Sequence, residues 1–429
     1  MRSERVECMN ALIRSVRCGL VVLSLGFTLS SHAATNSPAI ALARDAQGFN
    51  FLSWPAQTNA VFTLQSRADF FTGAWTNFNS SNALVTVTSN SFTVKDTRPV
   101  AGERQFYQLR SDAPSRFGVF ASYGRNPGTI SNALDLGAAW VRLNCDLDGN
   151  DPDFKSFLDA GFNLIITCSH RDTTNCATTY GTLAEWPNAG FPYKSRAAFQ
   201  ARITAMLAPV LPYLALGRQV WVQCENEIGD AALIPTARFF RGTTGEYVTN
   251  LTAFSEAVRS VSVSLVVALT SFASENLDAV TTPTDPNYVY QTNRMTLLLS
   301  STNYDAADLH FYGCVSDIAA KAQWVKDRLP AGRRWISTEN GGPDYRCPTT
   351  PLQYSNNPAL FESIMAQQVP ARLNAAATNG ATVSLWFSLF DPQGEADTFN
   401  HLGLLDQSVV PVRKKPAYDA FKAYTSTNR

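Results

Sequence analysis

Two glutamates, Glu227 and Glu339, each close an apolar run of the sequence. Asn226-Glu227 ends the run 219–227, and Glu339 ends the run 334–339. A buried strand does not normally finish in carboxylates, because an unpaired buried charge is costly. Paired carboxylates across a cleft suit glycosidic bond cleavage, in which one carboxyl donates a proton and the other attacks or stabilises the anomeric carbon. Glu227 and Glu339 are therefore the candidate catalytic pair.

Other polar and aromatic side chains stand at equivalent places in further apolar runs. Arg142 lies in the run 139–145, His170 ends 163–170, His310 and Tyr312 end 307–312, and Trp386 lies in 383–389. Arginine, histidine and tyrosine groups near two carboxyls can set their protonation states apart, which acid and nucleophile roles require. These five residues are the candidate partners of the two glutamates.

The elements that must position these side chains alternate between strands and helices. Eight apolar runs read as strands buried on both faces, namely 117–122, 139–145, 163–170, 219–227, 265–272, 307–312, 334–339 and 383–389. Amphipathic segments between them predict helices at 197–214, 246–261, 317–329, 359–379 and 416–424. This α/β pattern predicts a (β/α)8 TIM barrel over 116–427, whose active groups gather at the carboxyl ends of the strands. A doubly wound open sheet is disfavoured, because no glycine-rich loop follows the first strand.

The order of these motifs resembles clan A of the glycoside hydrolases, the retaining (β/α)8 enzymes of the family 5 cellulase and mannanase type. The resemblance rests on Asn226-Glu227 at the end of strand four and Glu339 at the end of strand seven. It implies that Glu227 is the acid/base, that Glu339 is the nucleophile, and that Asn226 holds the sugar 2-hydroxyl. Ile228 departs from the pattern, since many members have proline there. Glu225 should point away from the side used by Asn226, by strand alternation.

The same resemblance assigns roles to the remaining candidates. It implies that Arg142 and Tyr312 contact Glu339 and keep it ionised. It implies that His170 and His310 line the substrate-binding site and that Trp386 forms the sugar platform. From the residues alone, either histidine could equally be a hydrogen-bonded core histidine, and Trp386 could be barrel core.

The residues before the barrel fall into two parts. Residues 1–33 have the basic start, short apolar stretch and small residues of a secretory signal peptide. Residues 37–111 alternate with period two between turn residues, which predicts a small all-β sandwich. With Trp54, Trp75 and Tyr107 in a strand rhythm, it resembles a fibronectin type III module. Those aromatic residues are expected in its core, and residues 111–115 read as a linker.

Cysteine use fits an exported protein. Six cysteines follow residue 33, without the spacing of a zinc site. Cys314 and Cys347 fall in loops after neighbouring strands six and seven, on one barrel face, so we predict a disulfide between them. Cys145, Cys168 and Cys224 could form disulfides or be buried thiols.

Composition limits the partners. The chain of 429 residues has 35 Lys+Arg and 35 Asp+Glu, which argues against a nucleic-acid partner. No apolar run reaches the roughly 20 residues of a membrane span, so no membrane contact is expected after signal cleavage. The acidic loop 146–151 lacks the glycine and terminal glutamate of an EF-hand, so no metal or other cofactor is expected.

The sequence therefore predicts a secreted or periplasmic, monomeric, retaining β-glycoside hydrolase that acts on a β-linked polysaccharide or oligosaccharide. Two alternatives stay open. One is a carbohydrate-binding barrel protein without turnover, and the other is a transglycosylase that uses the same residues.

Overall fold

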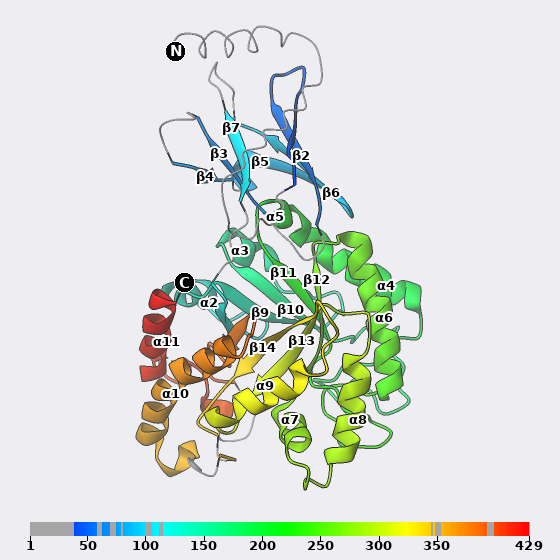
Figure 1. The fold of residues 1–429 in the computed structure, drawn as a ribbon, viewed down its shortest axis with the longest axis vertical. Helices are drawn as coiled ribbons and strands as arrows, with labels where there is room; N and C mark the ends of the chain where they lie inside the picture. Colours follow the sequence, from blue (N-terminus) through cyan, green and yellow to red (C-terminus); the bar gives the residue numbers. More distant parts are fainter. Residues whose placement is uncertain are drawn as a thin grey trace, which may run out of the picture.

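The computed structural model describes residues 38–428 except 58–61, 69–73, 79, 99–104, 111–114, 345, 348–352 and 393–398. The expected signal peptide and most of the expected linker lie outside these residues. Figure 1 shows a β domain above a larger barrel domain. The described residues contain no helix that is long and apolar enough to cross a membrane.

The N-terminal domain has two antiparallel sheets. One has the order β1 (Ala41–Arg44), β2 (Asn50–Pro55), β6 (Ser91–Asp96), β5 (Ala83–Thr88), and the other has the order β4 (Thr76–Asn77), β3 (Thr63–Arg67), β7 (Phe106–Arg110). Along β6 every second residue is buried, as period-two alternation requires. The predicted small all-β domain is confirmed.

The aromatic residues of this domain support its core. Trp54 is 2 % exposed and its ring lies 5.7 Å from that of Phe92. The Tyr107 hydroxyl donates to Asp96 at 2.9 Å, and Trp75 is half-buried with Arg67 over its ring. Trp54 and Tyr107 thus have structural roles, as the strand rhythm predicts.

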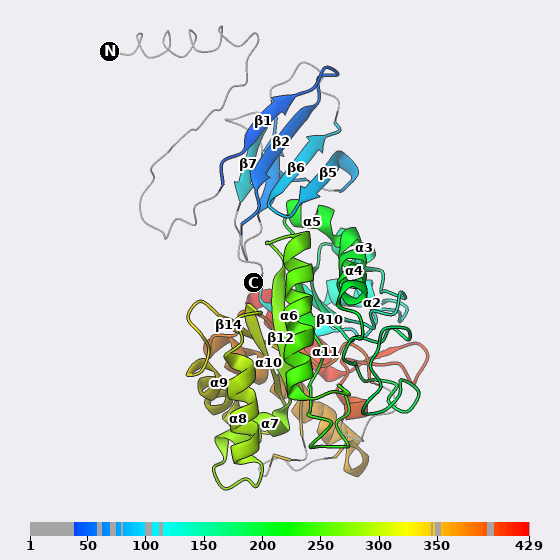
Figure 2. The ribbon, with the colours of Figure 1, turned by 90° about the vertical axis from the view of Figure 1, so that its right-hand side faces the viewer.

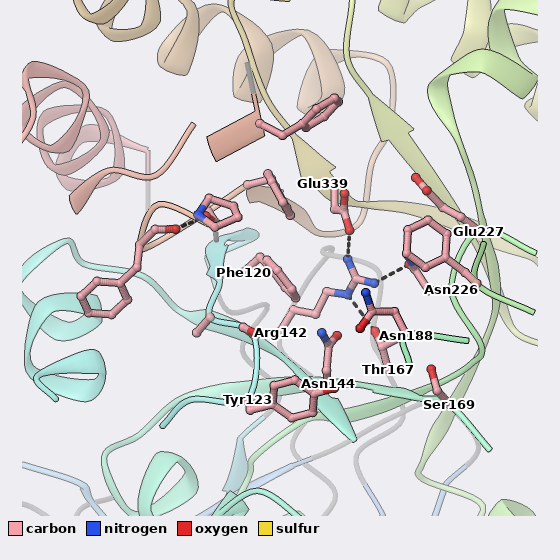
Figure 3. Close-up of a pocket in the computed structure, with 18 of the residues that line it drawn as sticks. Phe120, Tyr123, Arg142, Asn144, Thr167, Ser169, Asn188, Asn226, Glu227 and Glu339 are labelled. Atoms are coloured by element: carbon pink, nitrogen blue, oxygen red, sulfur yellow. Dashed lines mark hydrogen bonds and ion pairs between the residues drawn. The ribbon is translucent and has the colours of Figure 1, made fainter. Parts of the chain in front are cut away.

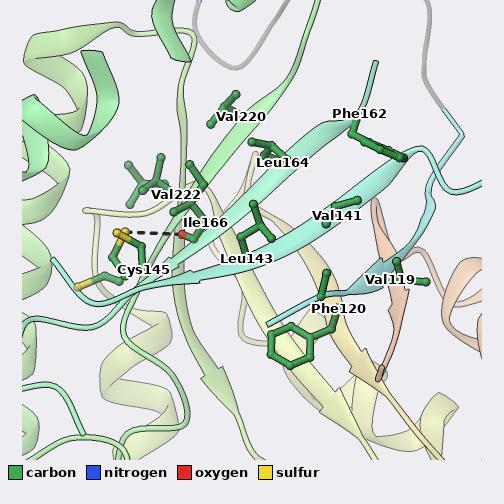
Figure 4. Packing of buried hydrophobic residues seen from close by; sticks show 14 of the residues in the cluster. Val119, Phe120, Val141, Leu143, Cys145, Phe162, Leu164, Ile166, Val220 and Val222 are labelled. Atoms are coloured by element: carbon green, nitrogen blue, oxygen red, sulfur yellow. Dashed lines mark hydrogen bonds between the residues drawn. The ribbon is translucent and has the colours of Figure 1, made fainter. Parts of the chain in front are cut away.

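Eight parallel strands close into a barrel, which confirms the predicted fold class. Around the barrel they follow chain order, and the last pairs with the first: β8 (Phe117–Phe120), β9 (Trp140–Cys145), β10 (Asn163–Cys168), β11 (Val220–Cys224), β12 (Val266–Phe272), β13 (Ala306–Phe311), β14 (Arg334–Asn340) and β15 (Ser384–Trp386). Figure 4 shows buried apolar side chains in and beside β8 to β11 that pack together in one cluster.

Helices surround this barrel (Figures 1 and 2). Six of them match the five predicted segments, with α4 and α5 sharing one segment: α4 (Arg196–Leu207), α5 (Leu211–Ala215), α6 (Thr244–Val261), α9 (Ile318–Lys326), α10 (Pro358–Thr378) and α11 (Pro416–Thr427). Four more were not predicted: α2 (Thr129–Asp135), α3 (Phe154–Asp159), α7 (Ser274–Thr281) and α8 (Tyr288–Leu299). Helix α6 begins with a capping box, in which Thr243 and Glu246 satisfy each other's backbone N–H groups.

The barrel interior changes from apolar to polar along its axis. Its lower layer is an apolar cluster that includes Trp140, Ile165 and Trp221. Two residues further along the same strands, the inward positions are Arg142, Thr167 and Gln223, all buried. The apolar layer closes the barrel floor, so the polar layer above it forms the base of the site.

The β domain contacts the barrel at the end opposite this polar layer. The Val263 backbone N–H, just before β12, donates to the Ser89 carbonyl at 3.2 Å, and the Ser264 hydroxyl donates to the Gln57 carbonyl at 3.1 Å. Gly217, just before β11, touches Thr63 so closely that an added Cβ would lie 2.7 Å from its Cα. The β domain therefore contacts the amino ends of the barrel strands (Figure 2).

The cysteines separate into two groups. Cys314 and Cys347 form the predicted disulfide, which joins the loops that follow β13 and β14. Cys145, Cys168 and Cys224 are buried thiols, in register on three neighbouring strands. The alternative that these three form disulfides is wrong for this structure.

Candidate active site

The two glutamates face each other across the barrel mouth (Figure 3). Glu339 belongs to β14, and Glu227 follows β11 after a turn in which Glu225 and Glu227 have positive φ angles of 61° and 37°. Single oxygens of Glu227 and Glu339 lie within 4.8 Å of each other. Both side chains are mostly shielded, with exposed fractions of 17 % for Glu227 and 10 % for Glu339.

Arg142 connects three elements of the site through its guanidinium group. It donates to Glu339 Oε1 at 2.6 Å, to Asn226 Oδ1 at 2.7 Å, and to the Thr167 hydroxyl at 2.7 Å. The Ser271 hydroxyl also donates to Asn226 Oδ1, at 2.9 Å. Because these donors occupy the Asn226 carbonyl oxygen, its amide nitrogen is left to donate into the cavity.

Tyr312 is the second donor to Glu339. Its hydroxyl lies 2.5 Å from Glu339 Oε2. Burial raises the pKa of Tyr312 well above its usual value, and the charge of Glu339 raises it further, so the phenol keeps its proton. Glu339 thus accepts one hydrogen bond on each oxygen, from Arg142 and from Tyr312.

Glu227 has a different environment, which favours its protonated form. Burial raises its pKa; His310 opposes this shift, and the charge of Glu339 adds to it. The Glu227 Oε1 atom lies 2.5 Å from His310 Nδ1. The two carboxyl groups therefore have different environments. Burial favours a proton on Glu227, whereas Glu339 accepts hydrogen bonds from Arg142 and Tyr312.

The glutamates open into a cavity of about 710 Å³. Its walls combine aromatic rings with small polar side chains, including Phe120, Tyr123, Asn144, Asn188, Phe239, Phe387, Phe390, Phe399 and Gln407. Ionised groups of its wall have nearby partners: Asp391 pairs with Lys415 at 2.6 Å, and Asp146 lies 4.0 Å from Arg171. Such a wall suits an uncharged ligand with many hydroxyl groups.

The structure brings six of the eight predicted site residues together: Arg142, Asn226, Glu227, His310, Tyr312 and Glu339. The other two, His170 and Trp386, do not line the cavity. His170 is fully buried beside the Phe199 ring, with Nδ1 2.9 Å from the Phe191 carbonyl, and it does not line the cavity. His310 is also fully buried, and it reaches the site only through Glu227 and Glu339.

Trp386, which was expected to form the sugar platform, lies outside the cavity lining. It is fully buried and donates from Nε1 to the Leu402 carbonyl at 2.9 Å, so the core interpretation is correct. Its neighbour Phe387 lines the cavity, stacked on Phe120 with ring centroids 5.2 Å apart. Strand β15 ends at Trp386, so the next side chain is free to turn into the mouth.

Phe387→Ala is expected to weaken binding of an uncharged, hydroxyl-rich ligand such as a neutral oligosaccharide. Losing one aromatic wall removes apolar contact with the ligand, so the Kd measured by calorimetry should rise by about 10- to 100-fold. Trp386→Phe is the matched control, because it alters a neighbouring ring outside the cavity; it should lower the melting temperature and leave the Kd nearly unchanged. A larger rise in Kd for Trp386→Phe than for Phe387→Ala would contradict the placement of Phe387 in the cavity wall.

Glu225 lies behind the barrel wall and outside the cavity lining. Its Oε1 accepts from the His170 backbone N–H at 2.9 Å, and its carboxyl lies against Gly190, where a Cβ atom would come within 1.9 Å. Burial raises the pKa of Glu225 to about 8. It therefore supports the loop after β10 instead of forming part of the cavity.

Several residues of the site were missed by the sequence analysis. Thr167, Gln223, Asp308 and Thr338 form the hydrogen-bonded layer beneath the glutamates. Strand alternation offered a signal for Asp308, which stands two residues before His310 and so on the same face of β13.

Glu227, His310 and Glu339 are also the side chains that could best hold a metal ion, since each offers one atom within 4.8 Å of the others. However, Arg142 already contacts Glu339, and His310 Nδ1 lies 2.5 Å from Glu227 Oε1. A cation would have to displace a proton and oppose a guanidinium charge, so the geometry fits proton transfer better than metal binding.

No protein-family model and no curated protein matches the chain. Solved structures similar to it include the exo-β-1,4-mannosidase Op5Man5 from Opitutaceae bacterium strain TAV5, at 15 % identity and a TM-score of 0.46, covering 76 % of this chain and 60 % of that one. They also include Xylanase10C from Cellvibrio japonicus in complex with xylopentaose, at 13 % identity and a TM-score of 0.45, covering 93 % and 97 %. A glucosidase from Croceicoccus marinus has 12 % identity and a TM-score of 0.47, covering 73 % and 68 %. The chain thus spans 60 % of the mannosidase, and its (β/α)8 class follows from its own closed strand order.

Proposed function

We propose that the protein is a retaining β-glycoside hydrolase that acts on an uncharged β-linked polysaccharide or oligosaccharide. The observation that carries this proposal is the approach of Glu227 and Glu339 oxygens to within 4.8 Å. Retaining enzymes hold their two carboxyl groups about 5–5.5 Å apart, whereas inverting enzymes need about 6.5–9.5 Å to admit a water molecule.

The reaction takes two steps. Glu227 gives its proton to the glycosidic oxygen while Glu339 attacks the anomeric carbon, so the bond to the leaving sugar breaks and a glycosyl–Glu339 ester forms. Glu227, now ionised, takes a proton from water, and the water oxygen displaces Glu339 from the anomeric carbon. Arg142 and Tyr312 stabilise Glu339 when it leaves as a carboxylate, and the Asn226 amide donates to the sugar 2-hydroxyl.

The proposal also includes the cellular location of the enzyme. Residues 1–33 have the pattern of a secretory signal, and the Cys314–Cys347 disulfide favours an oxidising compartment. We therefore infer that the enzyme meets its glycan outside the cytoplasm.

A substrate panel tests the activity. The purified chain should release reducing sugar from at least one of β-glucan, β-mannan, xylan and β-galactan, and a proton NMR time course should show the β-anomer first. Binding to a glycan without any product would instead indicate a carbohydrate-binding barrel. Longer products in the presence of acceptor sugars would indicate transglycosylation, and an α-anomer as first product would contradict retention.

A further inference from the structure

Beneath the two glutamates lies a third carboxylate that the proposed reaction does not use. Asp308, on β13, is fully buried in the barrel interior. It accepts from the Thr338 backbone N–H at 2.9 Å, from the Thr338 hydroxyl at 2.5 Å and from Gln223 Nε2 at 2.7 Å. A buried carboxylate is costly without a positive partner, so its presence requires an explanation.

The partner of Asp308 is His310. The Nε2 atom of His310 lies 3.3 Å from Asp308 Oδ2 and 3.1 Å from the Thr338 hydroxyl oxygen. Because the Thr338 hydroxyl already donates to Asp308, its oxygen can only accept from His310. At the other side of the ring, Nδ1 lies 2.5 Å from Glu227 and 3.3 Å from Glu339. Both ring nitrogens therefore face acceptors, which requires a proton on each when both glutamates are ionised.

We propose that Asp308 is a positioning residue that keeps His310 in its imidazolium form between Glu227 and Glu339, and so sets the protonation of the catalytic pair. The assignment of these two glutamates rests on the proposed function.

The charges of the site balance only when Asp308 is counted. With the proton on Glu227, the negative charges of Glu339 and Asp308 match the positive charges of Arg142 and His310. Without the Asp308 charge the buried cluster would carry one excess positive charge, which favours loss of a proton from His310 or Glu227. Other groups that face the cluster are the Tyr312 phenol, just after β13, and the Glu275 carboxylate from α7.

The direction of the pKa shifts agrees with this balance. Burial alone would lower the pKa of His310, but the charges of Glu339, Asp308 and Glu227 raise it to about 10. Burial alone would raise the pKa of Asp308, but His310 and Arg142 lower it to about 2. His310 therefore stays charged throughout the pH range in which Glu227 must give and take its proton.

A relay of hydrogen bonds also holds Asp308 in place from the opposite side of the barrel. Arg142 donates to Thr167, which donates to Gln223 Oε1 at 2.7 Å, and Gln223 donates from Nε2 to Asp308. The same arginine contacts Glu339 directly. Asp308 and Glu339 are thus joined through one chain of polar contacts, which explains why Asp308 can hold a fixed orientation.

The test measures the imidazole of His310 directly. Heteronuclear NMR of the full chain should show His310 charged from pH 5 to pH 9. In Asp308→Asn its pKa should fall by about 1 to 3 units, because an opposite charge within hydrogen-bonding distance is lost. The basic limb of the kcat/KM profile should move to lower pH in the same variant. His310→Ala identifies its resonance among the four histidines.

Asp305→Asn is the matched control. Asp305 is also a buried carboxylate, just before β13 at the other end of the barrel, where it pairs with Arg259 and Arg333. This variant should leave the His310 pKa unchanged. A neutral His310 at pH 7 in the unmodified protein would overturn the proposal, and this measurement holds even if Asp308→Asn fails to fold.

The outcomes separate this proposal from the proposed function. If no glycan is cleaved but His310 stays charged and titrates lower in Asp308→Asn, the proposed function fails and the role of Asp308 toward His310 stands. If Asp308→Asn lowers kcat/KM without moving either the His310 pKa or the basic limb, Asp308 is merely structural and the proposal is wrong.

Discussion

Glu339→Ala is expected to lower kcat for a β-glycoside by about 10⁴- to 10⁶-fold, the loss that removal of a hydrolase nucleophile causes. The reason is that no covalent ester can form, while the cavity and Glu227 are left intact. The measurement is initial velocity on the best substrate of the panel, compared with the unmodified chain.

Azide distinguishes loss of a nucleophile from loss of fold. The missing carboxylate leaves room beneath the anomeric carbon for a small anion, which can attack from the same face that Glu339 uses. An aryl β-glycoside should then give the α-glycosyl azide, with one inversion at the anomeric carbon, because Glu227 still protonates the leaving group. Glu362→Gln is the control, since Glu362 is equally shielded at 10 % exposure but pairs with Arg413 outside the site. Recovery of β-glycosyl azide would exclude Glu339 as nucleophile.

The barrel could be predicted from the sequence because its strands are buried on both faces. Continuous apolar runs then mark each strand, and the eight runs match the eight strands in order. The unpredicted helices α2 and α3 have seven and six residues, too few for a clear helical period. Their helical conformation depends on contacts such as those of Phe154 and Phe157, both buried, which the sequence pattern alone does not reveal.

Site residues could be predicted where the geometry of a strand determines the direction of their side chains, and not where they lie past the end of a strand. Arg142 and Tyr312 meet Glu339 because parallel strands bring their carboxyl ends to one face. His170 and Phe387 lie two residues and one residue past their strands, where alternation no longer fixes direction, so His170 was expected in the cavity and Phe387 was not predicted there. Asp308 was missed for another reason: its charge is tolerable only through partners from other strands, and those contacts exist only in the fold.

Glu227→Ala is expected to slow the first step of the reaction for substrates with a poor leaving group, but not for substrates with a good one. A poor leaving group needs protonation, so turnover of an oligosaccharide should fall by about 10²- to 10⁴-fold. A dinitrophenyl β-glycoside leaves without a proton, so its first step should continue and the glycosyl–Glu339 ester should accumulate, because no base activates water. A burst of dinitrophenol followed by a slow phase, together with a mass increase of one glycosyl unit, is the expected result.

Azide should release the glycosyl–Glu339 ester that accumulates in Glu227→Ala. The glycosyl azide formed should have the opposite anomeric configuration to the azide product of Glu339→Ala. It enters the space that Glu227 vacates and attacks the ester from the side of the departed sugar, so the product is the β-glycosyl azide after two inversions. Glu225→Gln is a close control, because Glu225 stands two residues away, lies outside the cavity lining and, with its pKa raised to about 8, is already mostly protonated at neutral pH. If Glu225→Gln showed the burst and Glu227→Ala did not, the acid/base would be Glu225. If both variants cleaved oligosaccharides at the unmodified rate, neither carboxyl would be the proton donor, and the opposite environments of Glu227 and Glu339 would need another explanation.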